Sequence, residues 1–202
     1  TDSDGRNADQ ATDLNNLGEV SFASRRADGL LNAYIWKDGV ARANGNELPV
    51  SINDMSDVVV NYQIGETYVV LDGGLVKNGK LSKLPRPGGE FDWSKIVAIN
   101  NKNQVIGYVD LPCGQEGGCR HGFIITKGVI KDLGEGEISG INNRGQVLIN
   151  RDGGPSIWQE GKYKKLAGVE KNSAVDINDW GQVIGKLPHP FESGLVDPDN
   201  IA

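Results

Sequence analysis

Cysteine and histidine are the residues of this chain best suited to bind a metal ion or attack a substrate, and there are only two of each. Three of these four lie together as Cys113, Cys119 and His121, with the spacing Cys-x5-Cys-x-His. The segment between the cysteines is rich in glycine, so a flexible hairpin loop can bring the two sulfur atoms together in a disulfide. Two free thiols are the alternative. A metal site is disfavoured, because three ligands at this spacing match no known zinc pattern.

The other polar residues form no recognisable catalytic motif. His121 falls in a predicted strand, where a structural hydrogen bond is favoured over catalysis, and His189 lies in a predicted loop between two prolines. The chain has no nucleophile elbow, phosphate-binding loop or zinc-protease motif. Its 27 Asp and Glu residues include no pair that stands out as the acid and base of a glycosidase. We therefore expect no catalytic residue, no metal and no cofactor, and the acidic segment 197–200 does not match a calcium-binding loop.

Charge excludes two classes of partner. The net charge is −6 at pH 7, and the isoelectric point is near 5.0. Nucleic acid is bound by clustered Lys and Arg, and anionic membrane surfaces attract the same residues, so neither partner is expected. No apolar run reaches the length of about 18 residues that a membrane helix needs. The remaining partners are proteins, glycans or a second copy of the chain.

A seven-residue motif occurs five times along the chain. Its repetition indicates the fold that must position the polar residues. Its pattern is an aliphatic residue, Asn, Asn or Asp, any residue, a small turn-forming residue, any residue and Val. The copies are Leu14–Val20, Ile52–Val58, Ile99–Val105, Ile141–Val147 and Ile177–Val183. Successive copies are 38, 47, 42 and 36 residues apart. A period near about 40 residues is typical of repeat architectures whose units stack on their neighbours.

Each unit is predicted to contain four strands. The Asn-rich motif predicts a tight turn between the first two strands, since Asn and Gly tolerate positive φ. A second turn of the type x-Gly, at Asp38-Gly39, Asn78-Gly79, Lys127-Gly128 and Glu160-Gly161, predicts a hairpin between the last two. No segment has helical periodicity. We therefore predict a polar lead-in over residues 1–10 and one all-β domain over 11–202, with units starting near 11, 50, 96, 138 and 174.

Five such units predict a five-bladed β-propeller of four-stranded antiparallel sheets. The fifth unit matches the pattern poorly after its motif, so its fourth strand either is supplied by the N-terminal residues, lies in a longer array from which this chain is a fragment, or is absent and leaves the last blade incomplete. An open array of β repeats is the structural alternative. In either arrangement Trp36 and Trp158 occupy one column of the third strand, and both are expected in the core between blades.

The motif also supplies the best candidates for a binding site. Its variable fourth position lies at the tip of the first turn, and the same turn of every blade should point to one rim. These residues are Leu17, Met55, Lys102, Arg144 and Trp180. Turn tips are usually polar, so the apolar side chains of Leu17, Met55 and Trp180 indicate either packing on a neighbouring blade or contact with a partner.

The motif together with the triplet His121-Gly122-Phe123 resembles the bacterial extracellular repeats called the HAF family. The closest unit runs from Ile99 to Leu133, and the similarity extends over residues 11 to about 200. The resemblance implies a β-propeller in an exported protein, located outside the cell, at the cell surface or in the periplasm. It implies no particular activity.

Two functions are compatible with these observations. The first is a non-enzymatic extracellular binding or assembly module, whose repeats present a surface to a protein or glycan partner. The second is a fragment of a carbohydrate-active enzyme, a glycosidase or a lyase, built on a propeller. Most loops are short and no acid pair stands out, and both features favour the binding or assembly module.

Overall fold

The computed structural model describes residues 10–25, 31–62, 73–87, 93–112, 118–186 and 193–196. All regular secondary structure in these ranges is β-strand, and hence none of it is a helix that could cross a membrane. Gln10 already belongs to the first strand, and the rest of the predicted lead-in lies outside the described residues. The prediction of an all-β fold is confirmed.

The strands form five antiparallel sheets, each made of consecutive strands. The first two sheets are β1 (Gln10–Leu14), β2 (Val20–Arg25), β3 (Leu31–Lys37), β4 (Val40–Gly45) and β5 (Leu48–Ile52), β6 (Val58–Asn61), β7 (Gly73–Lys77), β8 (Lys80–Lys83). The next two are β9 (Trp93–Ile99), β10 (Val105–Pro112), β11 (Gly118–Thr126), β12 (Val129–Glu135) and β13 (Glu137–Ile141), β14 (Val147–Asn150), β15 (Ser156–Gln159), β16 (Lys162–Lys165). The fifth has three described strands, β17 (Asp176–Ile177), β18 (Val183–Lys186) and β19 (Ser193–Val196).

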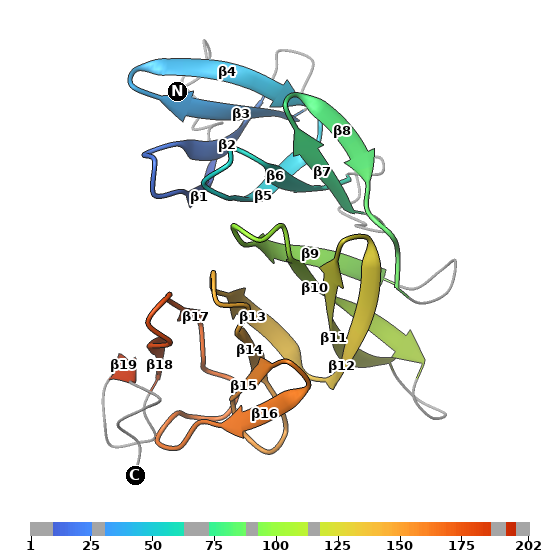
Figure 1. Cartoon of the computed structure of the whole chain (residues 1–202), viewed down its shortest axis with the longest axis vertical. Helices are drawn as coiled ribbons and strands as arrows, with labels where there is room; N and C mark the ends of the chain where they lie inside the picture. The colour runs from blue at the N-terminus through green and yellow to red at the C-terminus, as the bar shows by residue number, and fades with distance from the viewer. Residues whose placement is uncertain are drawn as a thin grey trace.

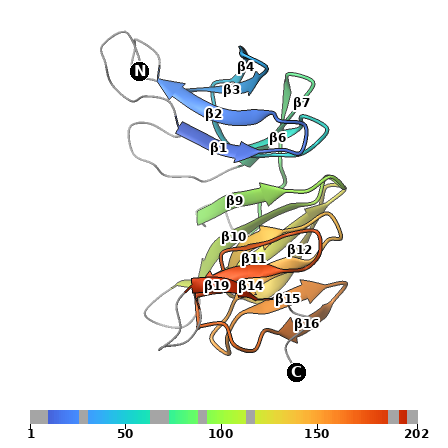
Figure 2. The same ribbon diagram turned by 90° about the vertical axis from the view of Figure 1, so that its left-hand side faces the viewer.

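The sheets follow one another around a common centre like the blades of a propeller. Figure 1 shows β1, β5, β9, β13 and β17 on the inner side of an arc, with the last strands of the four-stranded sheets toward the outside. The arc is open between the β1–β4 sheet and the β17–β19 sheet. The view turned by 90° shows β1–β4 with β6 and β7 at one end of the molecule and β9 to β19 below them, with β19 overlapping β14 (Figure 2). The predicted blade architecture is confirmed, with an open ring and a last blade that has three strands in the described ranges.

Both predicted turns are present in the blades. The first turn, which we call the inner turn, follows the inner strand. It has positive φ at the small residue of every motif copy, namely Gly18, Ser56, Asn103, Gly145 and Gly181. The second, which we call the outer turn, has two successive residues with positive φ. Its members are Asp38-Gly39, Asn78-Gly79, Lys127-Gly128 and Glu160-Gly161. Two such residues define the hairpin turn whose twist matches that of the strands.

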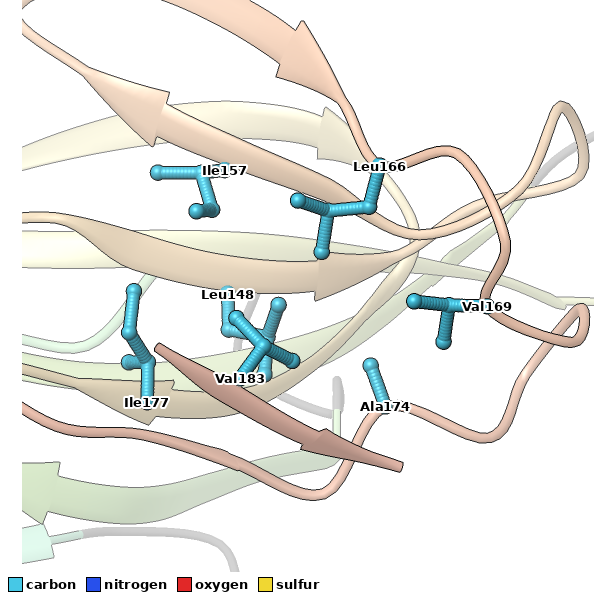
Figure 3. Packing of buried hydrophobic residues seen from close by; sticks show 7 residues of the cluster. All are labelled: Leu148, Ile157, Leu166, Val169, Ala174, Ile177 and Val183. Atoms are coloured by element: carbon cyan, nitrogen blue, oxygen red, sulfur yellow. The ribbon is translucent and has the colours of Figure 1, made fainter. Parts of the chain in front are cut away.

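The hydrophobic core lies between blades. Alternate residues of a strand point to opposite faces, so each middle strand packs against the blade before it and the blade after it. Figure 3 shows one such layer, in which Leu148 and Ile157 of the fourth sheet meet Ile177 and Val183 of the fifth. A comparable cluster joins Ile35 of the first sheet to Val58 and Val60 of the second. Each blade is thus stabilised mainly by its neighbours.

The two tryptophans of the third-strand column differ in burial. Trp158 is 7 % exposed and packs in the cluster between the third and fourth sheets, as predicted. Trp36 is 41 % exposed, so its predicted place in the core is wrong. The face that carries this column points toward the preceding blade, and the first sheet has no preceding blade among the described residues.

Candidate interaction surface

The first Asn of the motif holds each inner turn together. In the third unit, the Asn100 side-chain Oδ1 accepts hydrogen bonds from the backbone N–H of Lys102 and of Gln104, both at 3.0 Å. The Asn100 backbone N–H donates to the Gln104 carbonyl at 3.1 Å, and its Nδ2 donates to the Gln104 side chain at 2.8 Å. The corresponding side-chain bonds to the turn backbone occur in the other four units. A single side chain thereby satisfies a turn that has few backbone bonds of its own.

The same Asn side chain also reaches the next blade. Its Nδ2 donates to the backbone carbonyl of the equivalent Asn one unit further along the chain. The four bonds are Asn15 to Asn53 at 2.9 Å, Asn53 to Asn100 at 3.2 Å, Asn100 to Asn142 at 3.0 Å and Asn142 to Asn178 at 2.8 Å. We call this series the Asn ladder. All four donors are at least 92 % buried, so these bonds are shielded from water.

The second polar residue of the motif forms a parallel series. The backbone N–H of each unit donates to the side-chain Oδ1 of the next, with lengths between 2.7 and 2.8 Å from Asn16 to Asp54, Asp54 to Asn101, Asn101 to Asn143 and Asn143 to Asp179. Asp54 Oδ2 accepts side-chain bonds from both Asn16 and Asn101. Each of the first four inner turns therefore makes two kinds of bond to the next turn, and in both series the donor lies in the earlier unit; the additional side-chain bond from Asn101 to Asp54 runs the other way.

Two acids of this network, Glu19 and Asp54, are held ionised. Burial alone would raise the pKa of Glu19, but hydrogen bonds from Ser56 and Asn15 and the charges of Arg42 and Lys37 hold this pKa below its ordinary value. The Ser56 hydroxyl lies 2.6 Å from Glu19, and Arg42 lies 2.9 Å away. The pKa of Asp54 is also lowered. Hydrogen bonds from Asn16 lower it most, a bond from Asn101 lowers it further, and burial raises it in part.

The five predicted binding residues lie at the tips of the inner turns, and the ladder sets these turns side by side. We call this surface the rim. All five are exposed, and for the three apolar members the exposed fractions are 52 % for Leu17, 47 % for Met55 and 76 % for Trp180. Lys102 Nζ donates to the Arg144 carbonyl at 3.1 Å, so adjacent tips touch. None of the apolar tips is tucked into the core of a neighbouring blade.

A cavity of about 440 Å³ adjoins the rim between the fourth and fifth sheets. Its walls come from the inner turns, through Arg144, Gln146 and Gly181, and from the outer turn, through Gln159, Glu160 and Lys162. Arg144 is fixed there by a bond of 2.9 Å from its Nη2 to Gln146. Trp180 precedes Gly181 directly, so the most exposed apolar side chain of the rim stands beside a polar recess.

The residues considered for redox or metal chemistry are only partly within the described ranges. Cys119 lies in β11, whereas Cys113, His189 and the acidic segment 197–200 lie outside the described residues, so the Cys113–Cys119 disulfide stays a prediction. His121 Nδ1 lies 3.1 Å from the Asp132 carboxylate, which also accepts the Gly134 N–H. The described ranges gather no three His, Cys, Asp or Glu side chains that could hold a metal ion.

A second cavity of about 930 Å³ opens at the other end of the third and fourth sheets. Three of its four acids, Asp110, Glu137 and Asp152, are paired with cations. Arg120 lies 3.1 Å from Asp110 and 3.5 Å from Glu137, and Lys171 lies 3.0 Å from Asp152. Arg120 also covers the ring of Tyr108, at 4.2 Å from its centroid. These contacts account for the three paired acids as structural ion pairs.

Comparison with known proteins supports the fold only. No protein family and no curated protein matches this sequence. Among solved structures, an acylaminoacyl peptidase bound to Z-Gly-Gly-Phe-chloromethyl ketone superposes with a TM-score of 0.61 at 12 % identity, over 93 % of this chain and 37 % of the peptidase. The Pyrococcus horikoshii acylaminoacyl peptidase gives 0.54 at 13 %, over 88 % and 35 %.

A third similar structure is the β-propeller domain of the Trilobed protease from Pyrococcus furiosus, with a TM-score of 0.46 at 11 % identity, over 93 % of this chain and 81 % of that domain. The chain spans little more than one third of the two peptidases. At these identities the likeness extends to the blade architecture and not to an activity.

Proposed function

We propose that this chain is a non-enzymatic binding module, exported from the cell, whose rim contacts a protein or glycan partner. The observation that carries the proposal is the exposure of three apolar tips on one continuous row of turns. Trp180 alone leaves 76 % of its surface open to water. Burying an exposed Leu or Met is worth about 1.5–3 kcal/mol, and Trp is among the residues that most often dominate binding energy.

The charged members of the rim add specificity. Arg144 and Lys102 sit between the apolar tips, and Arg144 also lines the 440 Å³ cavity. Such a surface suits a partner with an apolar or sugar face and a nearby acceptor group, because a planar guanidinium can donate two parallel bonds. The pattern of an aromatic anchor with an Arg beside a recess is typical of binding surfaces.

The rim can be tested with Trp180→Ala. Because Trp180 has little contact with the protein, the substitution should change the free energy of unfolding by less than about 1 kcal/mol, whereas a buried aromatic such as Trp158 should cost about 3–5 kcal/mol when truncated. Ligands found with the wild-type protein on a glycan array or by affinity capture should bind Trp180→Ala at least about tenfold more weakly.

Val129→Ala is the matched control. Val129 is 69 % exposed and stands beside an outer turn, so Val129→Ala removes exposed apolar surface away from the rim. Its binding should equal that of the wild type. Undiminished binding by Trp180→Ala, or a loss of stability as large as that of Trp158→Ala, would contradict the proposal.

A further inference from the structure

The two ends of the arc differ from its interior in the exposure of equivalent residues. The position after the motif valine faces the next blade. Val59, Ile106 and Leu148 occupy it in the second, third and fourth units, and each is 0 % exposed. Ile184 occupies it in the fifth unit and is 50 % exposed. The forward face of the last blade therefore carries an apolar residue at a position that is buried in the preceding blades, and here this residue is half exposed.

The first blade has the opposite face open. Its motif begins with Leu14, which is 62 % exposed, whereas Ile52, Ile99 and Ile177 at the same position are 4 %, 6 % and 4 % exposed. Trp36 lies on this face too. Phe22 and Tyr34 share it by strand alternation, and their rings stack with centroids 5.2 Å apart. We call the Leu14–Trp36 surface and the Ile184 surface the end faces.

The hydrogen bonds of the inner turns also stop at the end faces. Asn178 Nδ2 donates to Gln182, but its bond to a next unit is missing among the described residues, as is that of the Asp179 backbone N–H. At the other end, the Asn15 carbonyl accepts the Gly18 N–H of its own turn, but within the described ranges neither it nor Asn16 Oδ1 receives the donor from a preceding unit that the same atoms receive in later units. The last blade therefore offers donors, and the first blade offers acceptors.

We propose that copies of this chain associate head to tail, with the Ile184 end face of one copy packed on the Leu14–Trp36 end face of another. The contact continues an interface that the chain already makes four times between its own blades. It buries apolar side chains on both sides, and it lets Asn178 and Asp179 donate to Asn15 and Asn16 of the second copy.

A second copy is the occupant that the hydrogen bonds select. Two identical ends cannot pair, since donors would meet donors or acceptors would meet acceptors, so a symmetric face-to-face dimer is disfavoured. A head-to-tail contact leaves one end of each type free, and repeated addition leads to a closed ring or a filament. The association uses the strand faces together with the inner turns of Asn15 and Asn178, so it continues the rim from one copy to the next.

The test is sedimentation velocity of the full chain over a wide concentration range. The wild type should sediment faster as its concentration rises. Trp36→Asp and Ile184→Asp each place a charge on one end face, and each should raise the dissociation constant at least about tenfold. Val129→Asp, which adds the same charge beside an outer turn, should associate like the wild type.

Mixing the two end-face variants separates the proposal from its alternatives. Trp36→Asp keeps an intact Ile184 face, and Ile184→Asp keeps an intact Leu14–Trp36 face. An equimolar mixture should therefore form dimers that neither variant forms alone. A wild type that stays monomeric at every concentration overturns the proposal, and so does association that the mixture fails to restore. If the wild type is monomeric and both variants unfold at a lower urea concentration than the wild type, the two end faces close on each other within one chain, which also overturns the proposal.

Discussion

Each four-stranded blade has two tight turns at the same end of its sheet, and they are stabilised by different means. The outer turns depend on local backbone conformation. At Gly39, Gly79 and Gly128, no atom lies within 4 Å of the place where a Cβ would stand. The inner turns depend on side chains, and the Asn that organises each of them is bound to the next blade.

This difference separates two tasks of a repeat protein. An outer turn needs only to reverse the chain with the correct twist, so its sequence reflects φ alone. An inner turn must also fix the position of the neighbouring blade. Its buried amides are satisfied only when that neighbour is in register, and an unsatisfied buried amide costs about 1–3 kcal/mol.

The largest expected effect comes from removing one rung of the Asn ladder. Asn100→Ala deletes four side-chain hydrogen bonds, two to its own turn, one to Gln104 and one to Asn142. At about 0.5–1.5 kcal/mol for each bond, the free energy of unfolding should fall by about 3 kcal/mol. Urea unfolding followed by tryptophan fluorescence measures this change.

The same substitution in an outer turn is the control. Asn78 is exposed and has a φ of 50°, so Asn78→Ala should cost about 1 kcal/mol, because only the left-handed conformation is penalised. Equal losses of unfolding free energy in Asn100→Ala and Asn78→Ala would show that inner and outer turns are stabilised by the same means.

A smaller loss of stability is expected from the bonds made by the second polar residue of the motif. Asp54 Oδ2 accepts from two amide groups, so Asp54→Asn places an amide donor against the donors of Asn16 and Asn101. The free energy of unfolding should fall by about 1–2 kcal/mol. Asp152→Asn, at a side chain that is 96 % exposed and makes one ion pair, should leave the urea midpoint unchanged. A neutral Asp54→Asn would indicate that this series contributes nothing to the register of the blades.

The smallest effect concerns pH. Gln104, Gln146 and Gln182 accept the Asn amide in the later units, so Glu19→Gln should keep that bond and lose the charge together with the ion pair to Arg42. The folded-state pKa of Glu19 lies below its ordinary value of 4.5, so its charge stabilises the protein above that pH and ceases to do so as the pH falls further.

Urea midpoints of wild type and Glu19→Gln should therefore differ modestly at neutral pH and converge in acid. A difference that stays constant or grows on acidification would contradict the assigned role of the Glu19 charge.

Much of the fold could be predicted because the motif combines local signals. Positive φ was expected at the small residues of both turns, and the structure has it at Gly18 and Gly145 as at Gly79 and Gly128. These conformations follow from the local sequence of each turn. The exposure of Trp180 could be anticipated for the same reason, since it follows from a position at the tip of a tight turn.

The Asn ladder could not be predicted, because its bonds depend on distance between blades. The sequence marks Asn15 or Asn100 as turn-forming and gives no sign that the free Nδ2 hydrogen reaches another unit. Trp36 shows the same limit. Its column and neighbours match those of Trp158, and only the absence of a preceding blade in the described residues makes it exposed.

The sequence spacing between rungs of the Asn ladder indicates where the chain tolerates insertions. Its rungs join residues separated by 38, 47, 42 and 36 positions, yet the bonds are alike. The extra residues are accommodated elsewhere in each unit, since the hydrogen bonds between inner turns involve only residues of the seven-residue motif. Insertions in the connections at the other end of the sheets should leave the inner turns undisturbed. The length of these connections can therefore vary without changing how the blades are placed, and foreign peptides could be grafted into them.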